Sequence, residues 1–286
     1  MSILRKLGMF LVLVIIACNN ENPKATSGPE GYSDKTAKKV FLIGHGSNSK
    51  EVIKELVNVS GLRKEGYIVI LPSRFEKSDS SVYYLKHEFN EQHINAVHSL
   101  EFKPGVNIQN TDILAIENAG LICIMDGEKK DLIRFAQDSI LNKALDNAFN
   151  NGTTIAGYGA GASVLAEKQF IVNKNYTKEI EEGNITAEKY KLVDGLGIVK
   201  NVVIENFDFL QNNKQKAKET IQRHNIPFIE IGPFTTLKLI NNIATVTGRY
   251  QYKVTLLKPA SENQAKKIIE EIYSNGDTFE ITLPDE

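Results

Sequence analysis

Short apolar segments alternate with segments of helical spacing over residues 38–156, and this alternation constrains the fold more than any other feature. Val52, Ile53, Leu56 and Val57, for example, recur at the spacing of one helix face. Strands that alternate with amphipathic helices indicate an α/β fold, with a mostly parallel sheet and helices on both faces. The predicted strands are 38–43, 67–71, 95–100, 120–125 and 152–156, and the predicted helices follow residue 49 and span 111–119 and 129–150.

Glycine-bearing turns follow three of these strands, at 44–46, 126–127 and 157–161. Ligands of parallel sheets bind in loops at the carboxyl ends of the strands, so we expect the three turns to line one pocket. The candidate ligand-binding residues in or beside these turns are Gly44, His45, Gly46, Gly127, Lys129, Tyr158, Gly159 and Ala160.

The second half of the chain has a different pattern. Residues 173–191 are polar and are typical of an inserted loop or an exposed helix, whereas 211–224 are typical of a charged helix. Short alternating segments over 227–257 predict an antiparallel C-terminal addition packed on the parallel sheet. Residues 261–274 (SENQAKKIIEEIYS) predict a capped amphipathic helix. Since no linker or internal repeat interrupts this part, we predict one domain over 38–286.

The N-terminus has the order of a secretory signal. Arg5 and Lys6 precede an apolar run over 7–17, which ends immediately before Cys18. That run is too short for a membrane span, which needs about 20 residues. The arrangement resembles the lipobox of bacterial lipoproteins, which implies cleavage before Cys18 and lipidation of its thiol. An ordinary signal peptide, or an anchor that happens to end in cysteine, is the alternative.

We therefore expect a signal peptide at 1–17, a flexible tether rich in Pro, Gly and Ser at 18–37, and membrane attachment at the bacterial cell envelope. Composition excludes several other classes. The chain is 42% hydrophobic, too apolar for a disordered protein. Its 34 Lys and Arg against 35 Asp and Glu leave no basic surplus for a nucleic-acid partner. Two cysteines do not make a disulfide scaffold.

Residues 152–166 (GTTIAGYGAGASVLA) predict a strand that enters a helix through a sharp turn of small residues. The nucleophile elbow of many hydrolases, G-x-S-x-G, has this form, with the central side chain exposed above the sheet. Here the five positions are 157–161, and the centre is Gly159. Glycine accepts the strained backbone of an elbow without steric cost, but it supplies no nucleophile.

At this turn the chain resembles the cyanophycinase-like serine peptidases, relatives of the class I glutamine amidotransferase-like fold. That family has GTSAGA where this chain has GYGAGA at 157–162. The resemblance covers most of the chain after the tether. The other matching segments are the glycine turn at 44–46, the family's GGDQ at 126–129, its GLGLL at 195–199, its DQHF at 205–208 and its acidic IDE-x-TAL at 231–237.

The departures from the family pattern fall on its chemistry. The resemblance places the serine nucleophile at Gly159, the histidine base at Phe207, the acidic pair at Gly232 and Pro233, and a glutamine at Lys129. Acyl transfer by this route needs a hydroxyl, a base and a group that orients the base. The backbone oxyanion donors at Ala160 and the 44–46 turn need no particular side chain, so the resemblance implies that they are kept.

Several residues allow rival interpretations. Ser163 lies one helical turn after the elbow and is either a relocated nucleophile or a packing residue. His45 is either a base or anion binder, or an exposed loop residue. Tyr158 either contacts a ligand or fills the former substrate site. The spacing of His87, His93 and His98 does not suit a metal site, and a loose dinucleotide fingerprint at 157–162 lacks its acidic residue.

We therefore expect a lipid-anchored, catalytically inactive pseudo-peptidase that binds a small ligand or a partner, with a small carboxylate or peptide as the candidate ligand and with no metal and no cofactor. The alternative is an active serine-type hydrolase of acidic or β-aspartyl peptides with relocated catalytic groups.

Overall fold

The structure is a computed structural model that describes residues 36–46, 49–62, 64–73, 80–102, 108–173, 175, 189–207, 209–249, 253–260 and 267–281. These belong to one compact unit, Gly31–Glu286. Cys18, the expected signal peptide and nearly all of the expected tether lie outside the described residues. In the described part, no helix is long and apolar enough to cross a membrane.

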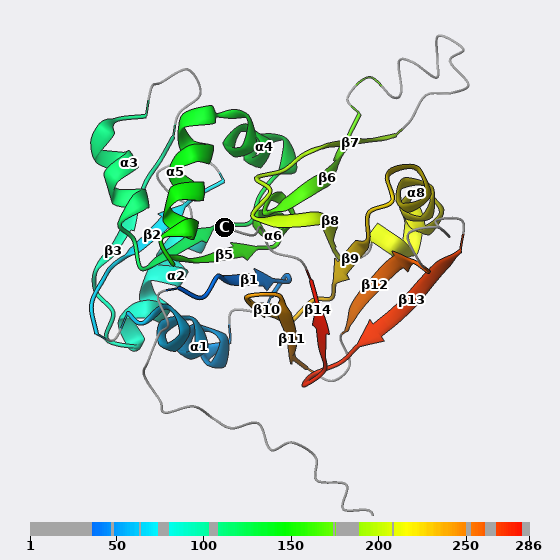
Figure 1. The fold of residues 1–286 in the computed structure, drawn as a ribbon. Coiled ribbons are helices and arrows are strands. Elements are labelled where there is room, and N and C mark those ends of the chain that lie inside the picture. Colours follow the sequence, from blue (N-terminus) through cyan, green and yellow to red (C-terminus); the bar gives the residue numbers. More distant parts are fainter. Residues whose placement is uncertain are drawn as a thin grey trace, which may run out of the picture. The chain divides into compact units, whose positions relative to one another are not determined.

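The first sheet has eight strands, and its centre is parallel, as predicted (Figure 1). Strand β1 pairs in parallel with β5, β5 with β4, β4 with β2, and β2 with β3. An antiparallel edge, β10, β11 and β14, extends the sheet beyond β1. In sheet order the strands are β14 (Thr278–Glu280), β11 (Ile243–Gly248), β10 (Thr235–Ile240), β1 (Lys39–Ile43), β5 (Thr154–Tyr158), β4 (Leu121–Ile124), β2 (Ile68–Leu71) and β3 (Val97–Ser99).

Helices cover both faces of this sheet because alternate strand residues point to opposite sides. Val40 and Leu42 of β1 belong to a core cluster with helices α3, α4 and α5. Phe41 and Ile43, between and after them, belong to a second cluster with α1 and α2. The predicted α/β class is therefore confirmed. The helices are α1 (Lys50–Ser60), α2 (Ser80–Glu91), α3 (Asn110–Glu117), α4 (Lys129–Gln137), α5 (Ser139–Asn150) and the short α6 (Ala160–Val164).

Local caps explain where several helices begin and end. The Ser49 hydroxyl accepts a hydrogen bond from the Val52 N–H and starts α1, and Gly61, with φ of 74°, ends it. The helical pattern predicted over 129–150 is divided into α4 and α5 at Asp138. The Asp138 carboxylate accepts the first N–H groups of α5 and so starts a new helix there.

A second, six-stranded sheet follows the elbow. Strands β6, β8 and β9 are parallel, and β7, β12 and β13 pair antiparallel at the two sides. Helix α8 packs on one face of this sheet through a core cluster that includes Phe170, Leu210 and Phe228. The elements are β13 (Ile268–Tyr273), β12 (Val254–Pro259), β9 (Phe228–Ile231), β8 (Val199–Asn206), β6 (Ala166–Val172), β7 (Tyr190–Asp194) and α8 (Phe209–His224).

The C-terminal part corrects two details of the sequence prediction. The antiparallel strands after residue 227 are present, but they are divided between both sheets instead of forming one addition. The amphipathic helix predicted over 261–274 is wrong for its second half, which is strand β13. Ile268 to Tyr273 pair residue by residue with β12, so ladder hydrogen bonds and packing override the helical spacing. The first half of that predicted helix, 261–266, lies outside the described residues.

Candidate active site

The elbow between β5 and α6 has the sharp geometry that the sequence predicts. Gly159 has φ of 53° and ψ of −120°, a conformation that side-chain-bearing residues rarely adopt. A Cβ on Gly157 would lie less than 3.0 Å from the carbonyl oxygen of Gly161, and one on Gly161 would approach the Ile124 carbonyl as closely. The strand and helix therefore meet at a distance that only glycine allows.

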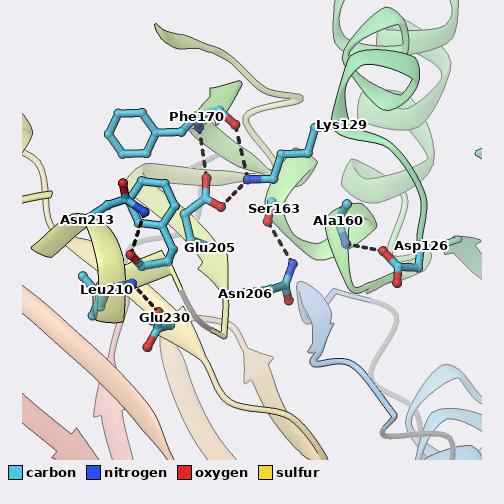
Figure 2. A network of polar contacts seen from close by, with 11 residues as sticks. Asp126, Lys129, Ala160, Ser163, Phe170, Glu205, Asn206, Leu210, Asn213 and Glu230 are labelled. Atoms are coloured by element: carbon cyan, nitrogen blue, oxygen red, sulfur yellow. Dashed lines mark hydrogen bonds and ion pairs between the residues drawn. The ribbon is translucent and has the colours of Figure 1, made fainter. Parts of the chain in front are cut away.

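Asp126, from the turn after β4, occupies the space above the elbow. A Cβ on Gly159 would lie less than 3.0 Å from the carboxyl carbon and both carboxyl oxygens of Asp126. Its Oδ1 accepts a hydrogen bond of 2.8 Å from the N–H of Ala160 (Figure 2). The same oxygen accepts a second hydrogen bond of 2.8 Å from the N–H of Gly127. The Ala160 N–H is the expected oxyanion donor. A carboxylate of this chain already occupies that donor.

His45 completes the arrangement from the turn after β1. Its Nδ1 lies 2.8 Å from Oδ2 of Asp126. The hydrogen bond to Asp126 raises the pKa of His45, although partial burial opposes the shift. Burial alone would raise the pKa of Asp126, but the hydrogen bonds from His45 and Ala160 outweigh it, so that pKa is lowered. Both groups therefore favour their charged forms.

A buried ion pair lies beside the elbow, where α4 begins and β8 ends. Lys129 pairs with Glu205, whose side chain is almost fully buried, and also donates to the carbonyl oxygen of Phe170 (Figure 2). The other carboxyl oxygen of Glu205 accepts from the Phe170 N–H at 3.0 Å. Burial raises the pKa of Glu205, and the Lys129 ammonium opposes that shift. Lys129, which the sequence analysis gives as a candidate ligand-binding residue, therefore neutralises a carboxylate of this chain.

Ser163 lies inside α6, and its side chain is fully buried. Its hydroxyl oxygen accepts a hydrogen bond of 3.2 Å from the Asn206 amide (Figure 2). An amide N–H cannot take a proton from a serine hydroxyl. This environment suits the packing interpretation of Ser163 better than the relocated nucleophile.

These groups surround a cleft of about 830 Å³. Of the predicted binding residues, it brings together His45, Gly127, Lys129 and Ala160. Phe207, at the expected base position, lines it with 49% of its surface exposed. The other described lining residues are Asp126, Glu128, Lys189, Tyr190, Glu205, Asn206, Phe209, Asn212 and Asn213.

Four predicted binding residues do not line the cleft. Tyr158 is buried with the α1 and α2 core cluster, because strand alternation points it to that face, and burial raises the pKa of its hydroxyl. The structure therefore places the Tyr158 side chain in this core cluster and not along the cleft. Gly44 and Gly46 pack instead against the 232–235 turn, where the Gly44 N–H donates to the Thr235 carbonyl oxygen. Gly159 lies beneath the Asp126 carboxylate.

The sequence interpretation missed the roles of Asp126 and Glu205. The signal was present in the aligned segments. By the resemblance, Asp126 stands where the family's GGDQ segment has its first glycine, and Gly159 stands where the family's GTSAGA turn has serine. Relative to that pattern, this chain has the larger side chain on the first turn and none on the second. In the described part of the chain, no three His, Cys, Asp or Glu side chains gather as a metal site.

Comparisons with known proteins identify the family and the fold. Residues 40–247 match the model of peptidase family S51. A crystal structure of a peptidase from an acI-B1 Actinobacterium is similar, with a TM-score of 0.58 and 18% identity, over 88% of this chain and 98% of that chain. A putative peptidase E protein from Listeria monocytogenes EGD-e has a TM-score of 0.49 and 12% identity over 74% of this chain and 99% of that one. No curated protein sequence matches the chain. The family match spans most of the described fold, and the chain therefore belongs to peptidase family S51.

Proposed function

We propose that this family S51 protein is a lipid-anchored pseudo-peptidase that binds a small carboxylate or peptide ligand in the cleft and does not cleave it. One observation carries the proposal: the Asp126 carboxylate fills the space above Gly159 and accepts the Ala160 N–H. The groups that would attack a carbonyl and stabilise its oxyanion are both replaced by this contact.

The chemistry follows from the charges. A tetrahedral intermediate needs N–H donors aimed at a developing negative oxygen. At this elbow the Ala160 N–H already points to a carboxylate, and a second negative oxygen beside Asp126 would be repelled. Phe207 cannot replace the base that the family has at this position, because its ring has no titratable atom.

The proposal is also supported by the side chains that stand at the expected catalytic positions and contact one another. The Asp126 carboxylate occupies the space that a side chain at position 159 would need. The pair of Lys129 and Glu205 stands where the family has a glutamine and an aspartate, and its charges compensate each other in a buried position.

The cleft suits a small ligand. Its volume of about 830 Å³ lies within the range of about 300–1,000 Å³ that is usual for such sites. Lys189 and His45 supply cationic groups along its wall, and Tyr190 and Phe207 supply aromatic faces. This combination supports a ligand with a carboxylate and an apolar part.

The first part of the proposal, the absence of hydrolysis, is tested on the full chain, purified in neutral detergent. The substrates are aspartyl dipeptides and a β-linked aspartyl-arginine polymer. We expect no hydrolysis by the wild type or by Gly159→Ser. A Gly159→Ser, Asp126→Gly, Phe207→His variant is the one in which activity could return, because it frees the oxyanion donor and supplies both a hydroxyl and a base. Turnover by the wild type that Ser163→Ala abolishes would contradict the proposal.

The second part, ligand binding, is tested by calorimetric titration of an acidic dipeptide. We expect His45→Gln and Lys189→Gln each to weaken binding about tenfold, since a charge-assisted hydrogen bond contributes about 1.5–3 kcal/mol. Lys143→Gln on α5 is the matched control outside the cleft and should leave binding unchanged. Equal binding by all variants would mean that the dipeptide binds elsewhere.

The third part of the proposal, membrane anchoring, rests on the lipobox resemblance. Cys18→Ala should release the protein from the membrane fraction or leave it unprocessed, because one lipidated residue supplies the attachment. A processed, lipid-free Cys18→Ala protein that still fractionates with membranes would show that the interpretation of Cys18 is wrong.

One observation favours a second candidate, hydrolysis with a relocated base. Asp126 holds Nδ1 of His45, while the ring is 56% exposed at the cleft, so Nε2 could take a proton from water. This function predicts turnover that rises with pH as His45 loses its proton and that His45→Asn abolishes. The same turnover should survive Ser163→Ala.

A further inference from the structure

A second cavity, of about 380 Å³, is lined by residues from the C-terminal half of α8 and from strands β6 and β7 of the second sheet. It shares no described lining residue with the cleft. Its helical wall is formed by residues 216, 219, 220 and 223, whose spacing places them on one face of α8. Phe170 and Leu192 contribute apolar surface from the strands.

The charges around this cavity are strongly one-sided. Only one carboxylate, Glu219, is among its described lining residues. On the strand side, Lys168 forms an ion pair with Asp194, which neutralises one of the positive charges. The cationic or titratable lining residues are Lys168, Lys191, Lys216, Arg223 and His224. In a chain of net charge −1, such a concentration around one hollow is a local feature and not a consequence of composition.

Helix termini account for only part of the cluster. Arg223 and His224 lie in the last turn of α8, where cations interact favourably with the helix dipole. Lys168, Lys191 and Lys216 do not lie there. Arg223 is exposed and forms no ion pair with the residues that the structure describes. Like charges that converge on a hollow repel one another, and a bound anion relieves that repulsion.

We propose that this cavity binds a small phosphate ester. Arg223 supplies a planar fork of donors that matches phosphate oxygens, and lysines add point charges around it. The cavity exceeds the size of a bare ion, and the partly exposed Leu192 gives the organic part of an ester an apolar contact. The phosphate can belong to a free ester or to a lipid headgroup, because Arg223 and the lysines would contact the phosphate oxygens in the same way in both.

The test uses the full chain in neutral detergent, titrated with glycerol 3-phosphate, inorganic phosphate and acetate. Binding is followed by the NMR signal of the His224 ring, assigned with His224→Gln. We expect saturable binding of both phosphate compounds, with acetate bound at least tenfold more weakly. Arg223→Gln should weaken phosphate binding about tenfold or more. Lys218→Gln, on the same helix but outside the lining, is the matched control and should change affinity less than twofold.

Several outcomes would overturn the proposal: no saturation with either phosphate compound, equal affinity for acetate, or equal losses in Arg223→Gln and Lys218→Gln. Vesicles of phosphatidylglycerol and of phosphatidylcholine separate the two sources. A shift of the His224 signal with phosphatidylglycerol alone supports a headgroup, and displacement by free glycerol 3-phosphate supports a soluble ester.

Discussion

The two sides of the cleft are held by different kinds of interaction. On the elbow side, backbone groups meet at distances that only glycine permits, and Asp126 is bound by backbone N–H groups. On the second-sheet side, Lys129 and Glu205 depend on each other's charge in a buried position. The elbow therefore depends on backbone contacts that require glycine, whereas the ion pair depends on the side chains at both of its positions.

The largest expected effect is on the side-chain pair. Lys129→Met should destabilise the fold by about 3–5 kcal/mol, because it leaves the Glu205 carboxylate buried without its cation. Urea unfolding of the variant and the wild type measures the difference. Lys130→Met, the next residue along, removes an exposed pair with Glu128 and should cost less than about 1 kcal/mol. Equal losses would show that the two sides of the cleft do not differ in this way.

A double variant sharpens the same point. Lys129→Met with Glu205→Leu should recover most of the stability lost in Lys129→Met, since apolar residues replace both charges. If the double variant is as unstable as Lys129→Met, the loss comes from packing and not from the unpaired carboxylate.

The elbow is expected to respond to volume and not to charge. Gly161→Ala should cost about 3 kcal/mol, because its Cβ would meet the Ile124 carbonyl, and backbone atoms cannot move aside as a side chain can. Gly276→Ala is the control. It has φ of 94° but no atom within 4 Å of the added Cβ, so only backbone strain of about 1 kcal/mol applies. Thermal unfolding should rank the two variants in this order.

Asp126 and Gly159 should show coupled stability. Gly159→Ser alone brings its Cβ against the Asp126 carboxylate, whereas Asp126→Gly clears that space. We expect a coupling of about 1–2 kcal/mol, with the double variant more stable than the sum of the single losses predicts. Additive losses in a double-mutant cycle would mean that the two residues do not exchange volume.

The smallest expected effect is the pH dependence of the pair between His45 and Asp126. The raised pKa of His45 adds stability that is complete below its unfolded pKa of about 6.5 and is lost as the pH rises through the folded value. The lowered pKa of Asp126 adds stability above its unfolded pKa of about 3.9, which is lost as the pH falls through the folded value. Because both side chains are more than one third exposed, we expect less than about 1 kcal/mol.

NMR titration of the His45 ring measures this effect. Asp126→Asn should lower the pKa of His45 toward its ordinary value, because the hydrogen bond to Asp126 is the main cause of the shift. An unchanged His45 pKa in Asp126→Asn would mean that the contact does not form in solution.

Much of the fold was predictable because local patterns and tertiary packing agree over the first half of the chain. The five predicted strands are present, and alternating residues of β1 reach both core clusters. The prediction failed over 268–273, where residues IIEEIY suit a helix by spacing but pair with β12. Helical spacing in a short segment cannot show that a partner strand lies within reach.

For the site, the sequence alone determined which side chains are present, and only the tertiary structure decided which groups they contact. The sequence has glycine at 159 and phenylalanine at 207, where the resemblance places the family's nucleophile and base. That Asp126 fills the space above Gly159, that Glu205 neutralises Lys129 and that Tyr158 points into the core depend on contacts between segments tens of residues apart. The reason is physical. A residue's identity limits the chemistry it can perform, but its charge and volume act only on the groups that folding brings against it.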